Sequence, residues 1–391
     1  MTLRILDDLG DISGLRVFVR VDFNVPLESG DVADDARIRA SLPTITELLD
    51  RGATLVLASH LGRPKGSVDD SLTTRGPAER LQELLGRPVK WLAHPVPKAL
   101  PDDAVVMLDN LRFDPGEEAD DLTFAGRLAE LADAYVDDAF GAAHRAHASV
   151  SALPELMRAS GRPAVAGRLL QREVEVLGGL LRDPARPYIA ILGGAKVSDK
   201  LAVVDALIDR VDALLIGGAM ANTLIAADGG EVGESLVERD RFDDVRATRA
   251  KAKARGVLIE VPQDAVAAAE MSLDAPRQTV PATAIPRGLK ALDIGPRTVE
   301  SYAQILADAK TILWNGPMGV FELEPFSAGT RGVATAVANA DAFTVVGGGD
   351  SLLAIKKADL GDAFDHLSTG GGASLEFLEG KALPGIAILE A

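Results

Sequence analysis

The sequence predicts an α/β protein made of two doubly wound parallel-sheet domains joined by a helix and hinge. β-branched apolar runs alternate with amphipathic segments, as in βαβ units whose parallel strands are covered on both faces. The length of 391 residues favours more than one domain. The two parts also differ in chemistry, because four of the five histidines precede position 150 and every Gly-Gly pair falls at 178 or later. Two domains with different ligands explain this division.

Short runs rich in Val, Ile and Leu mark the expected strands, which span 15–22, 54–59, 104–108, 188–192, 213–216, 257–261, 310–314 and 342–346. Helical spacing of apolar residues predicts helices over 198–210 and 297–309. The segment 167–187 has the same spacing, and Pro184 would end it. It predicts a connecting helix in which Gly178-Gly179 is either a soft point or an ordinary pair of glycines in a surface helix.

Composition excludes several classes of function. A formal charge of −17 with 4% aromatic residues disfavours nucleic acid as a partner. The absence of cysteine excludes disulfides, thiolate catalysis and cysteine-based zinc sites, and it suits a reducing cytoplasm. The charged N-terminal residues do not resemble a signal peptide, and no apolar run approaches the roughly 18 residues of a membrane span. We expect a large cytoplasmic enzyme without a membrane association.

Familiar nucleotide-binding motifs are missing. No GxxxxGK[ST] sequence is present, which excludes a P-loop. The G-x-G spacings at 347/349 and 370/372 lack the third glycine of a dinucleotide fingerprint, since Leu352 and Leu375 stand there. His144 and His147 could share a helix face, but no third ligand is near them in sequence, so hydrogen-bonding roles are favoured over a metal site.

Basic residues of the first half lie in loop-like places: Arg37 follows the acidic turn 30–35, and the others follow predicted strands or strand-like runs. The carboxyl ends of strands face the ligand crevice in doubly wound sheets, where several guanidinium groups could grip a phosphate or carboxylate. The alternative is a set of surface arginines in an acidic protein. The residues concerned are Arg37, His60, Arg63, Arg112 and Arg145.

Glycine loops of the second half predict a phosphate-binding region. Gly193-Gly194-Ala195-Lys196 follows a strand and precedes a predicted helix that contains Lys200, so the two lysines could share one face. The segments 347–351 and 368–374 have a similar layout, and Asp350 could orient a phosphate-bound Mg²⁺. Each loop alone could be a tight turn, but three together favour nucleotide phosphates.

Taken together, these segments closely resemble the phosphoglycerate kinase family over essentially the whole chain. The matching segments are VRVDFNVP (19–26), RIRASLPTI (37–45), SHLGRPKG (59–66), NLRF (110–113), DAFGAAHRAHAS (138–149), ILGGAKVSDK (191–200), GGAMANT (217–223), WNGPMGVFE (314–322), GGGDS (347–351) and STGGGASLEFLEGK (368–381). The resemblance implies two Rossmann-like domains: 1–167, completed by 370–391, for 3-phosphoglycerate, and 168–369, with the linking helix, for the nucleotide. It implies reversible phosphoryl transfer between ATP and the carboxylate of 3-phosphoglycerate, giving ADP and 1,3-bisphosphoglycerate, by domain closure in a cytoplasmic monomer. The alternative is a non-catalytic phosphometabolite-binding protein of the same fold.

The resemblance also assigns roles residue by residue. The catalytic residues would be Arg37, Lys200 and Gly371. The residues binding 3-phosphoglycerate would be Asp22, Phe23, Asn24, Arg37, His60, Leu61, Gly62, Arg63, Arg112 and Arg145. Those binding the nucleotide would be Gly193, Gly194, Lys196, Lys200, Gly217, Leu292, Asn315, Pro317, Glu322, Gly348, Gly349, Asp350 and Ser351, with Asp350 serving the nucleotide-bound Mg²⁺.

Departures from the family pattern are mild and remove no charged catalytic group. Ala142, Ala219 and Ala291 stand where threonine, glycine and glycine are common, and Asp109 and Asp137 occupy sites that more often hold Glu and Asn.

Because both substrates are polyanions, we also predict a basic cleft on an otherwise acidic surface. It would be lined by Arg37, Arg63, Arg112, Arg145, Lys196 and Lys200.

Overall fold

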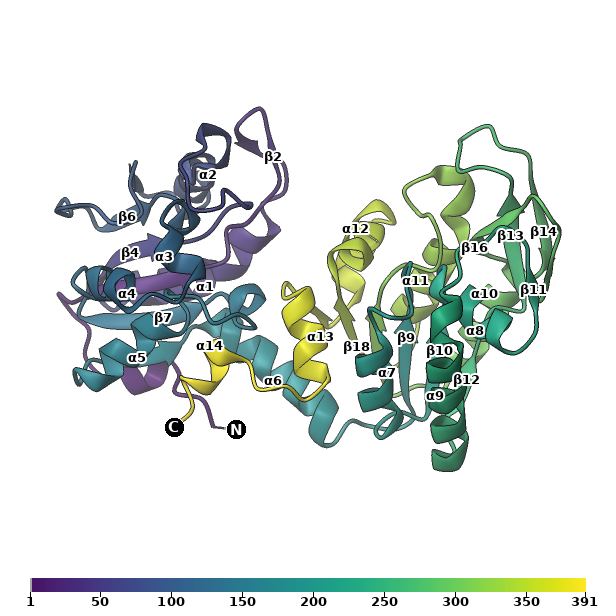
Figure 1. Ribbon diagram of the computed structural model, residues 1–391. Helices are drawn as coiled ribbons and strands as arrows, with labels where there is room; N and C mark the ends of the chain where they lie inside the picture. Colours follow the sequence, from purple (N-terminus) through teal and green to yellow (C-terminus); the bar gives the residue numbers. More distant parts are fainter. Residues whose placement is uncertain (1) are drawn as a thin grey trace. The chain divides into compact units, whose positions relative to one another are not determined.

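The computed structural model describes residues 2–391, which divide into two compact units (Figure 1). The first unit extends to Val176 and also includes Ala382–Ala391, and the second spans Leu177–Lys381. Each unit contains a six-stranded parallel sheet, which confirms the predicted fold class. None of the helices within residues 2–391 combines the length and apolar character needed to cross a bilayer.

The sheet of the first unit has the strand order β5-β6-β4-β1-β7-β8. Its strands are β1 (Arg16–Val21), β4 (Thr54–Ala58), β5 (Lys90–Leu92), β6 (Val105–Leu108), β7 (Ala134–Asp138) and β8 (Ala164–Ala166). The chain order reverses at β1, which pairs with β4 on one side and β7 on the other. Such a switch point places the loops that follow these strands around a crevice.

Helices cover both faces of this sheet. They are α1 (Ala36–Asp50), α2 (Arg75–Leu85), α3 (Pro115–Glu118), α4 (Leu122–Ala129) and α5 (Ala152–Ala159). Alternate residues of β1 face opposite ways: Val17 and Val19 pack in the core with Ile45 of α1, whereas Phe18 stacks on Tyr135 on the other face. The short hairpin β2 (Leu27–Glu28) and β3 (Asp31–Val32) precedes α1, and the C-terminal helix α14 (Pro384–Ala387) belongs to this unit.

The parallel sheet of the second unit has the order β12-β10-β9-β17-β18-β19 and reverses between β9 and β17. Its strands are β9 (Tyr188–Leu192), β10 (Ala213–Ile216), β12 (Leu258–Glu260), β17 (Thr311–Asn315), β18 (Phe343–Gly347) and β19 (His366–Leu367). A separate antiparallel sheet contains β13 (Asp264–Ala268), β14 (Arg277–Pro281) and β16 (Lys290–Ile294), and β11 (Glu231–Val232) pairs with β15 (Ala284–Ile285). The antiparallel sheet was not predicted.

The helices of this unit surround its parallel sheet. They are α7 (Leu201–Ile208), α8 (Met220–Ala227), α9 (Phe242–Arg255), α10 (Pro296–Ala307), α11 (Ala328–Ala338), α12 (Gly349–Lys357) and α13 (Gly372–Leu378). The fully buried Trp314 of β17 and Tyr302 of α10 belong to one core cluster with Ile191 of β9.

The helix α6 (Arg168–Arg182) lies where the connecting helix was predicted, and it ends before Pro184. It runs through Gly178-Gly179 without interruption. The two units divide within α6, between Val176 and Leu177 rather than at 167/168. Residues 370–381 group with the second unit, unlike the predicted boundary, because α13 packs on α7 and the Ser374 hydroxyl hydrogen-bonds Ser368, 2.7 Å away, just after β19.

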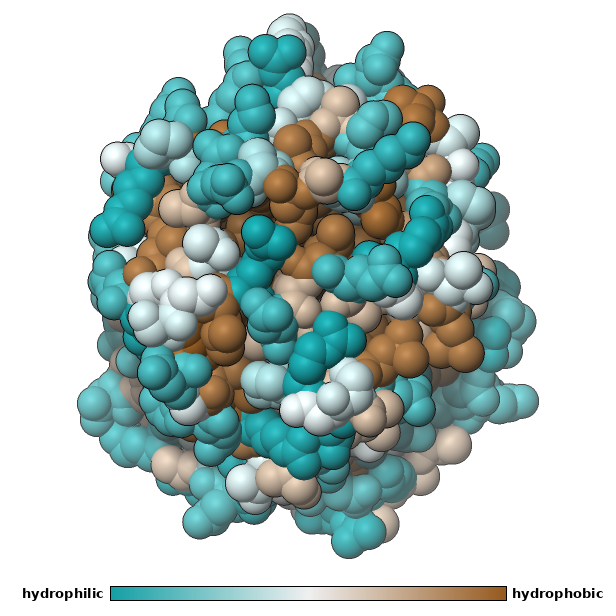
Figure 2. All heavy atoms as spheres, turned by 90° about the vertical axis from the view of Figure 1, so that its left-hand side faces the viewer, coloured by the Kyte–Doolittle hydropathy of each residue, from teal (hydrophilic) through white to brown (hydrophobic). Residues whose placement is uncertain are grey.

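One face of the molecule is shown in Figure 2, where hydrophilic side chains are interspersed with smaller hydrophobic areas. Single exposed apolar side chains, such as Val68 and Leu122, are ordinary features of a folded surface.

Candidate active site

In the first unit, the loops after β1 and β4 are joined by direct hydrogen bonds. The side-chain oxygen of Asn24 accepts from the Gly62 N–H at 2.9 Å. Asn110, after β6, binds both backbone groups of Leu61, with its amide donating to the carbonyl at 2.6 Å and its oxygen accepting from the N–H at 3.1 Å. These bonds fix the loops at the carboxyl edge of the sheet. Sequence reasoning gave Asn110 no role, although an Asn before a short helix is a recognisable cap.

Arg37 lies in the first turn of α1 and reaches back to the loop after β1. Its Nη1 donates to Asp22 Oδ2 at 3.0 Å and to the carbonyl oxygen of Asn24 at 3.1 Å. The Arg37 side chain is 33% exposed, whereas Asp22 is buried. A buried carboxylate therefore holds a partly accessible guanidinium group at the switch point, where it could meet an anion.

His60 and Arg112 are buried in the same region. Burial is the largest cause that lowers the pKa of His60 well below its usual value, and Arg20, Arg112 and Arg37 lower it further. His60 is therefore neutral at pH 7. Arg112 donates to the carbonyl oxygen of Gly62 at 2.8 Å, and its Nε lies 3.3 Å from Glu118 Oε1. Burial lowers the pKa of Arg112, yet a guanidinium group stays protonated at neutral pH.

Arg145 and Arg63 are both exposed. Arg145 donates from Nε to His144 Nε2 at 3.1 Å, and its charge lowers the pKa of Arg112 and of His147, which places it near both. Arg63 directly follows Gly62, but among residues 2–391 its side chain makes no hydrogen bond or ion pair.

Phe23 and Leu61 are almost fully buried, so they serve this region through their backbone groups. The Phe23 N–H donates to Ser59 Oγ at 2.8 Å. The structure thus brings together Asp22, Asn24, Arg37, His60, Gly62 and Arg112, with Arg145 nearby. It shows no contact that joins Arg63 to them.

In the second unit, the glycine loops after β9, β10 and β17 approach each other closely. The Gly193 N–H donates to the Asn315 carbonyl at 3.0 Å, and the Gly218 N–H donates to the Met318 carbonyl at 2.9 Å. A Cβ added to Gly193 would lie 2.0 Å from the carbonyl oxygen of Pro317, closer than any real contact. Glycine is needed here because the backbones themselves are in contact.

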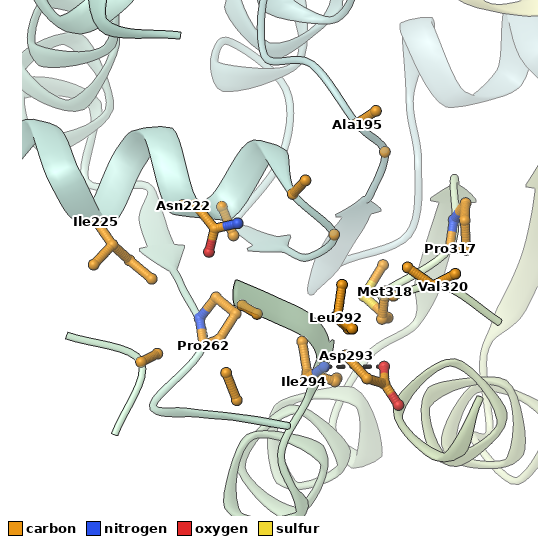
Figure 3. A pocket seen from close by; sticks show the side chains of 18 of the residues that line it. Ala195, Asn222, Ile225, Pro262, Leu292, Asp293, Ile294, Pro317, Met318 and Val320 are labelled. Atoms are coloured by element: carbon orange, nitrogen blue, oxygen red, sulfur yellow. Dashed lines mark hydrogen bonds between the residues drawn. The ribbon is translucent and has the colours of Figure 1, made fainter. Parts of the chain in front are cut away.

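A cavity of about 250 Å³ opens beside these loops (Figure 3). Of the predicted nucleotide residues, Gly194, Leu292, Pro317, Glu322 and Asp350 line it. Sequence reasoning missed most of its apolar wall, which includes Ile225, Pro262, Ala265, Ile294, Met318 and Val320. The wall comes from α8, the segment before β13, the antiparallel sheet and the loop after β17, so only the fold brings it together. An apolar slot with a few polar groups suits a flat heterocyclic ligand.

Asn222 and Asp293 are polar groups in this lining. Asp293 Oδ1 accepts from the Ile294 N–H at 2.9 Å, and Oδ2 accepts from the Gly329 N–H at 2.6 Å. Burial raises the pKa of Asp293 to about 7, although these two bonds act in the opposite direction. Its carboxyl group therefore holds the wall of the cavity in place.

Lys200 stands at the N-cap position of α7, without a side-chain capping bond, and is 8% exposed. Its Nζ donates to the backbone carbonyl of Asn315 at 3.2 Å and also contacts the Asn315 side-chain oxygen. Lys196 lies in an irregular loop and is exposed, so the expectation that both lysines share a helix face is wrong. The helix begins only at Leu201, since the glycine loop occupies the preceding residues.

The loop after β18 leads into α12. Gly348 adopts a φ of 93° at the N-cap, and Asp350 in the first turn is exposed and lines the cavity. Ser351 is buried and accepts from the Gly316 N–H at 2.6 Å, so its role is structural. A φ of 52° places Gly371 in the left-handed region at the N-cap of α13.

No group of three or more His, Asp or Glu side chains within residues 2–391 is arranged to hold a metal ion. Asp350 is an exposed carboxylate in the lining of the cavity, and such a group fits a magnesium ion that arrives with nucleotide phosphates and keeps most of its water ligands.

Comparison with known proteins gives one consistent result. The family model described as phosphoglycerate kinase matches residues 6–381. A phosphoglycerate kinase of Salinispora tropica is 53% identical over 406 residues, covering 100% of both chains. That of Moorella thermoacetica is 52% identical over 391 residues, covering 98% of each. Among solved structures, phosphoglycerate kinase from Coxiella burnetii superimposes with a TM-score of 0.89 at 39% identity, covering 99% of this chain and 98% of that chain.

Proposed function

From the premise that this chain belongs to the phosphoglycerate kinase family, we propose how its residues share the work of the reaction. The reaction is reversible phosphoryl transfer from ATP to the carboxylate of 3-phosphoglycerate, giving ADP and 1,3-bisphosphoglycerate. The chain is thus a glycolytic transferase. The family match over 6–381 carries this conclusion, and the cluster around Arg37 and His60 supplies matching chemistry.

We propose that the first unit binds 3-phosphoglycerate. His60, Arg63, Arg112 and Arg145 would hold its phosphate, and Asp22 and Asn24 its hydroxyl group. Arg37 would lie beside the carboxylate that attacks the γ-phosphorus. This carboxylate is ionised at neutral pH, so the reaction needs no general base and no cysteine nucleophile. The role of Arg37 is to offset negative charge while the new O–P bond forms.

The second unit is proposed to bind ATP. The base would lie in the apolar cavity, the ribose against Glu322, and the phosphates against Lys196, Lys200 and the loops at Gly193-Gly194 and Gly348-Gly349. Backbone N–H groups at Gly371 would meet the transferred phosphoryl group. Mg²⁺, held through Asp350 when nucleotide is bound, would neutralise phosphate charge. Residues Asn315, Pro317, Gly217, Leu292 and Ser351 would shape the site.

The same proposal includes domain closure, the cellular location, the oligomeric state and the partners. If the two substrates bind to different units, as proposed, the units would close to bring the reacting atoms within about 3–3.5 Å. Closure would also exclude water, which could otherwise take the phosphoryl group. We infer a cytoplasmic monomer whose partners are the two pairs of substrates and products, without nucleic acid or membrane.

An NADH-coupled assay with ATP, Mg²⁺ and 3-phosphoglycerate tests the function. We expect turnover that depends on all three components, and a folded sample without turnover would contradict it. The non-catalytic alternative is not favoured, because the charged groups and the glycine loops of the family are all present.

A further inference from the structure

A buried arginine, Arg20, lies near the end of β1, beside residues that are proposed to bind the phosphate of 3-phosphoglycerate. Arg20 is 0% exposed, and it stands in a strand whose other buried residues are apolar. Burying a guanidinium group in a sheet is costly unless each donor has a partner. The hydrogen-bond partners of Arg20 therefore indicate its role.

Each of the three nitrogens of the Arg20 guanidinium group has a hydrogen-bond partner. Nε donates to Ser149 Oγ at 2.8 Å, and Nη1 donates to the carbonyl oxygen of Val21 at 2.6 Å. Nη2 lies 3.1 Å from His60 Nδ1. The Ser149 hydroxyl donates in turn to Glu117 Oε1 at 2.6 Å, and this carboxylate is also fully buried. The bonds at Nε and Nη1 fix the plane of the guanidinium group, and this sets the position of Nη2 beside His60.

The contact with His60 determines which ring nitrogen carries the proton. An arginine N–H is always a donor, so Nδ1 of His60 must accept. The ring is neutral chiefly because it is buried, and the charges of Arg20 on β1, Arg112 after β6 and Arg37 on α1 lower its pKa further. The nearby His147 would act in the same direction only when protonated, and Asp22 Oδ1 lies 4.0 Å from His60 Nδ1. A neutral ring that accepts at Nδ1 carries its single proton at Nε2.

We propose that Arg20 is a positioning residue that holds His60 in the Nε2–H tautomer, so that the neutral ring is a fixed hydrogen-bond donor to the anionic substrate. The substrate part of this inference rests on the proposed function of the first unit. Arg20 itself does not touch the substrate. Its guanidinium group orients the ring, and Glu117 and Ser149 hold that group in place.

The tautomer can be tested without substrate. Long-range ¹H–¹⁵N NMR of imidazole nitrogens in the free enzyme at pH 7 should show His60 with a protonated Nε2 and an unprotonated Nδ1. In Arg20→Met the ring should become a mixture of tautomers. Because this variant leaves Glu117 as an unpaired buried charge, the double variant Arg20→Met/Glu117→Gln is compared with Glu117→Gln alone. A protonated Nδ1 in the wild-type enzyme, or an unchanged His60 in the double variant, overturns the proposal.

Kinetics tests the consequence for binding. We expect the double variant to raise the KM for 3-phosphoglycerate about 10-fold over Glu117→Gln, the loss of one charge-assisted hydrogen bond, with the KM for ATP changed less than twofold. Tyr302→Phe is a control for the loss of a buried hydrogen bond: it removes the bond from Tyr302 Oη to the Ile216 carbonyl at 2.7 Å, in the second unit, and involves none of Arg20, Ser149, Glu117 and His60. An equal rise in this control would make the effect merely structural and overturn the proposal.

A mutant cycle connects the two residues. If Arg20 acts through His60, adding Arg20→Met to a His60→Gln/Glu117→Gln background should raise the KM for 3-phosphoglycerate less than twofold further. Independent, multiplying effects overturn the proposal. An unchanged KM in His60→Gln in an otherwise active enzyme would overturn the assignment of His60 as a substrate ligand, while the reaction itself would stand.

Discussion

The Nζ of Lys200 donates to the backbone carbonyl oxygen of Asn315 across 3.2 Å, which ties the loop after β9 to the end of β17. These two strands flank the switch point of the second unit. Burial lowers the pKa of Lys200 to about 8, and the nearby Asp199 and Asp350 only partly oppose this shift. The charge of Lys200, which is proposed to contact the nucleotide phosphates, is therefore lost at moderately alkaline pH.

The first prediction is an alkaline limb in the pH profile. In the free enzyme, Lys200 is charged below about pH 8 and neutral above it. We expect kcat/KM for ATP to fall above pH 8, since this quantity reports groups of the free enzyme. In Lys200→Arg, whose guanidinium group stays charged, the fall should move to higher pH even if the rate is lower. An identical limb in both enzymes would assign the titration to another group.

The second prediction concerns stability at the same position. The lowered pKa means that the folded state binds the Lys200 proton less tightly than the unfolded state, whose lysine has a pKa near 10.5. The cost of burying the charge is complete below pH 8 and disappears as the pH rises towards 10.5. Lys200→Met should thus be more stable than the wild type by about 1–3 kcal/mol at pH 7 and equally stable near pH 10.5. Urea unfolding at both pH values measures this, and a less stable variant at pH 7 would contradict it.

The third prediction is a steric one. Gly193→Ala places a methyl group 2.0 Å from the carbonyl oxygen of Pro317, so the loop after β9 must move. We expect the KM for ATP to rise at least about tenfold, because misplaced loops lose their phosphate contacts, while the KM for 3-phosphoglycerate changes little. Gly361→Ala is the control, since its Cβ meets nothing within 4 Å. Similar kinetics for both variants would show that the close approach is not needed.

Long, β-branched strands were predictable from the sequence, and short or alanine-rich ones were not. The run over 188–192 became β9 with the same bounds. The three-residue strands β5 and β8 are too short to show alternation, and β13, with the sequence DAVAA, has little β-branched character. Their pairing comes from long-range contacts in the sheet, which local propensity does not contain.

Site residues with a local sequence signal were likewise predictable, and those defined by long-range contacts were not. Charged residues after strands, such as His60 and Arg112, were found from their position alone. Arg20 was missed because a lone charge within an apolar strand has no local motif, and its partners Glu117 and Ser149 are about a hundred or more positions away. The apolar wall of the nucleotide cavity was missed for a related reason. Residues such as Ile225 and Val320 look like ordinary core until the fold leaves a space between them.

The fourth prediction concerns Asp137, where the family more often has asparagine. Asp137 Oδ1 accepts from the Ala139 N–H at 2.9 Å, whereas its Oδ2 is buried without a hydrogen-bond partner in the described part of the chain. Burial raises the pKa of Asp137 to about 7, above the 3.8 of an ordinary aspartate. The folded state therefore favours the neutral acid, and the wild type loses stability as the pH rises from about 4 through 7.

Asp137→Asn removes this titration. We expect the variant to be more stable than the wild type by about 1–3 kcal/mol at pH 8, with a smaller difference at pH 5, where the wild-type carboxyl group is already protonated. Chemical unfolding of both proteins at the two pH values is the measurement. A difference that is the same at pH 5 and pH 8 would show that Asp137 does not titrate in this range.

The fifth prediction separates charge stabilisation from binding at Arg37. Its Nη1 is held by Asp22 at 3.0 Å, so the guanidinium group is oriented before the substrate arrives, which is how charge stabilisation avoids reorganisation during the reaction. Arg37→Ala should lower kcat roughly 10³-fold, like other arginines that stabilise phosphoryl transfer. Arg39→Ala is a matched control on the same helix, since Arg39 is 54% exposed and pairs with Asp35, and it should retain wild-type kinetics. Steady-state rates with both substrates varied decide the matter. A rise confined to the KM for 3-phosphoglycerate would make Arg37 a binding residue, because uniform binding of ground and transition states leaves kcat unchanged.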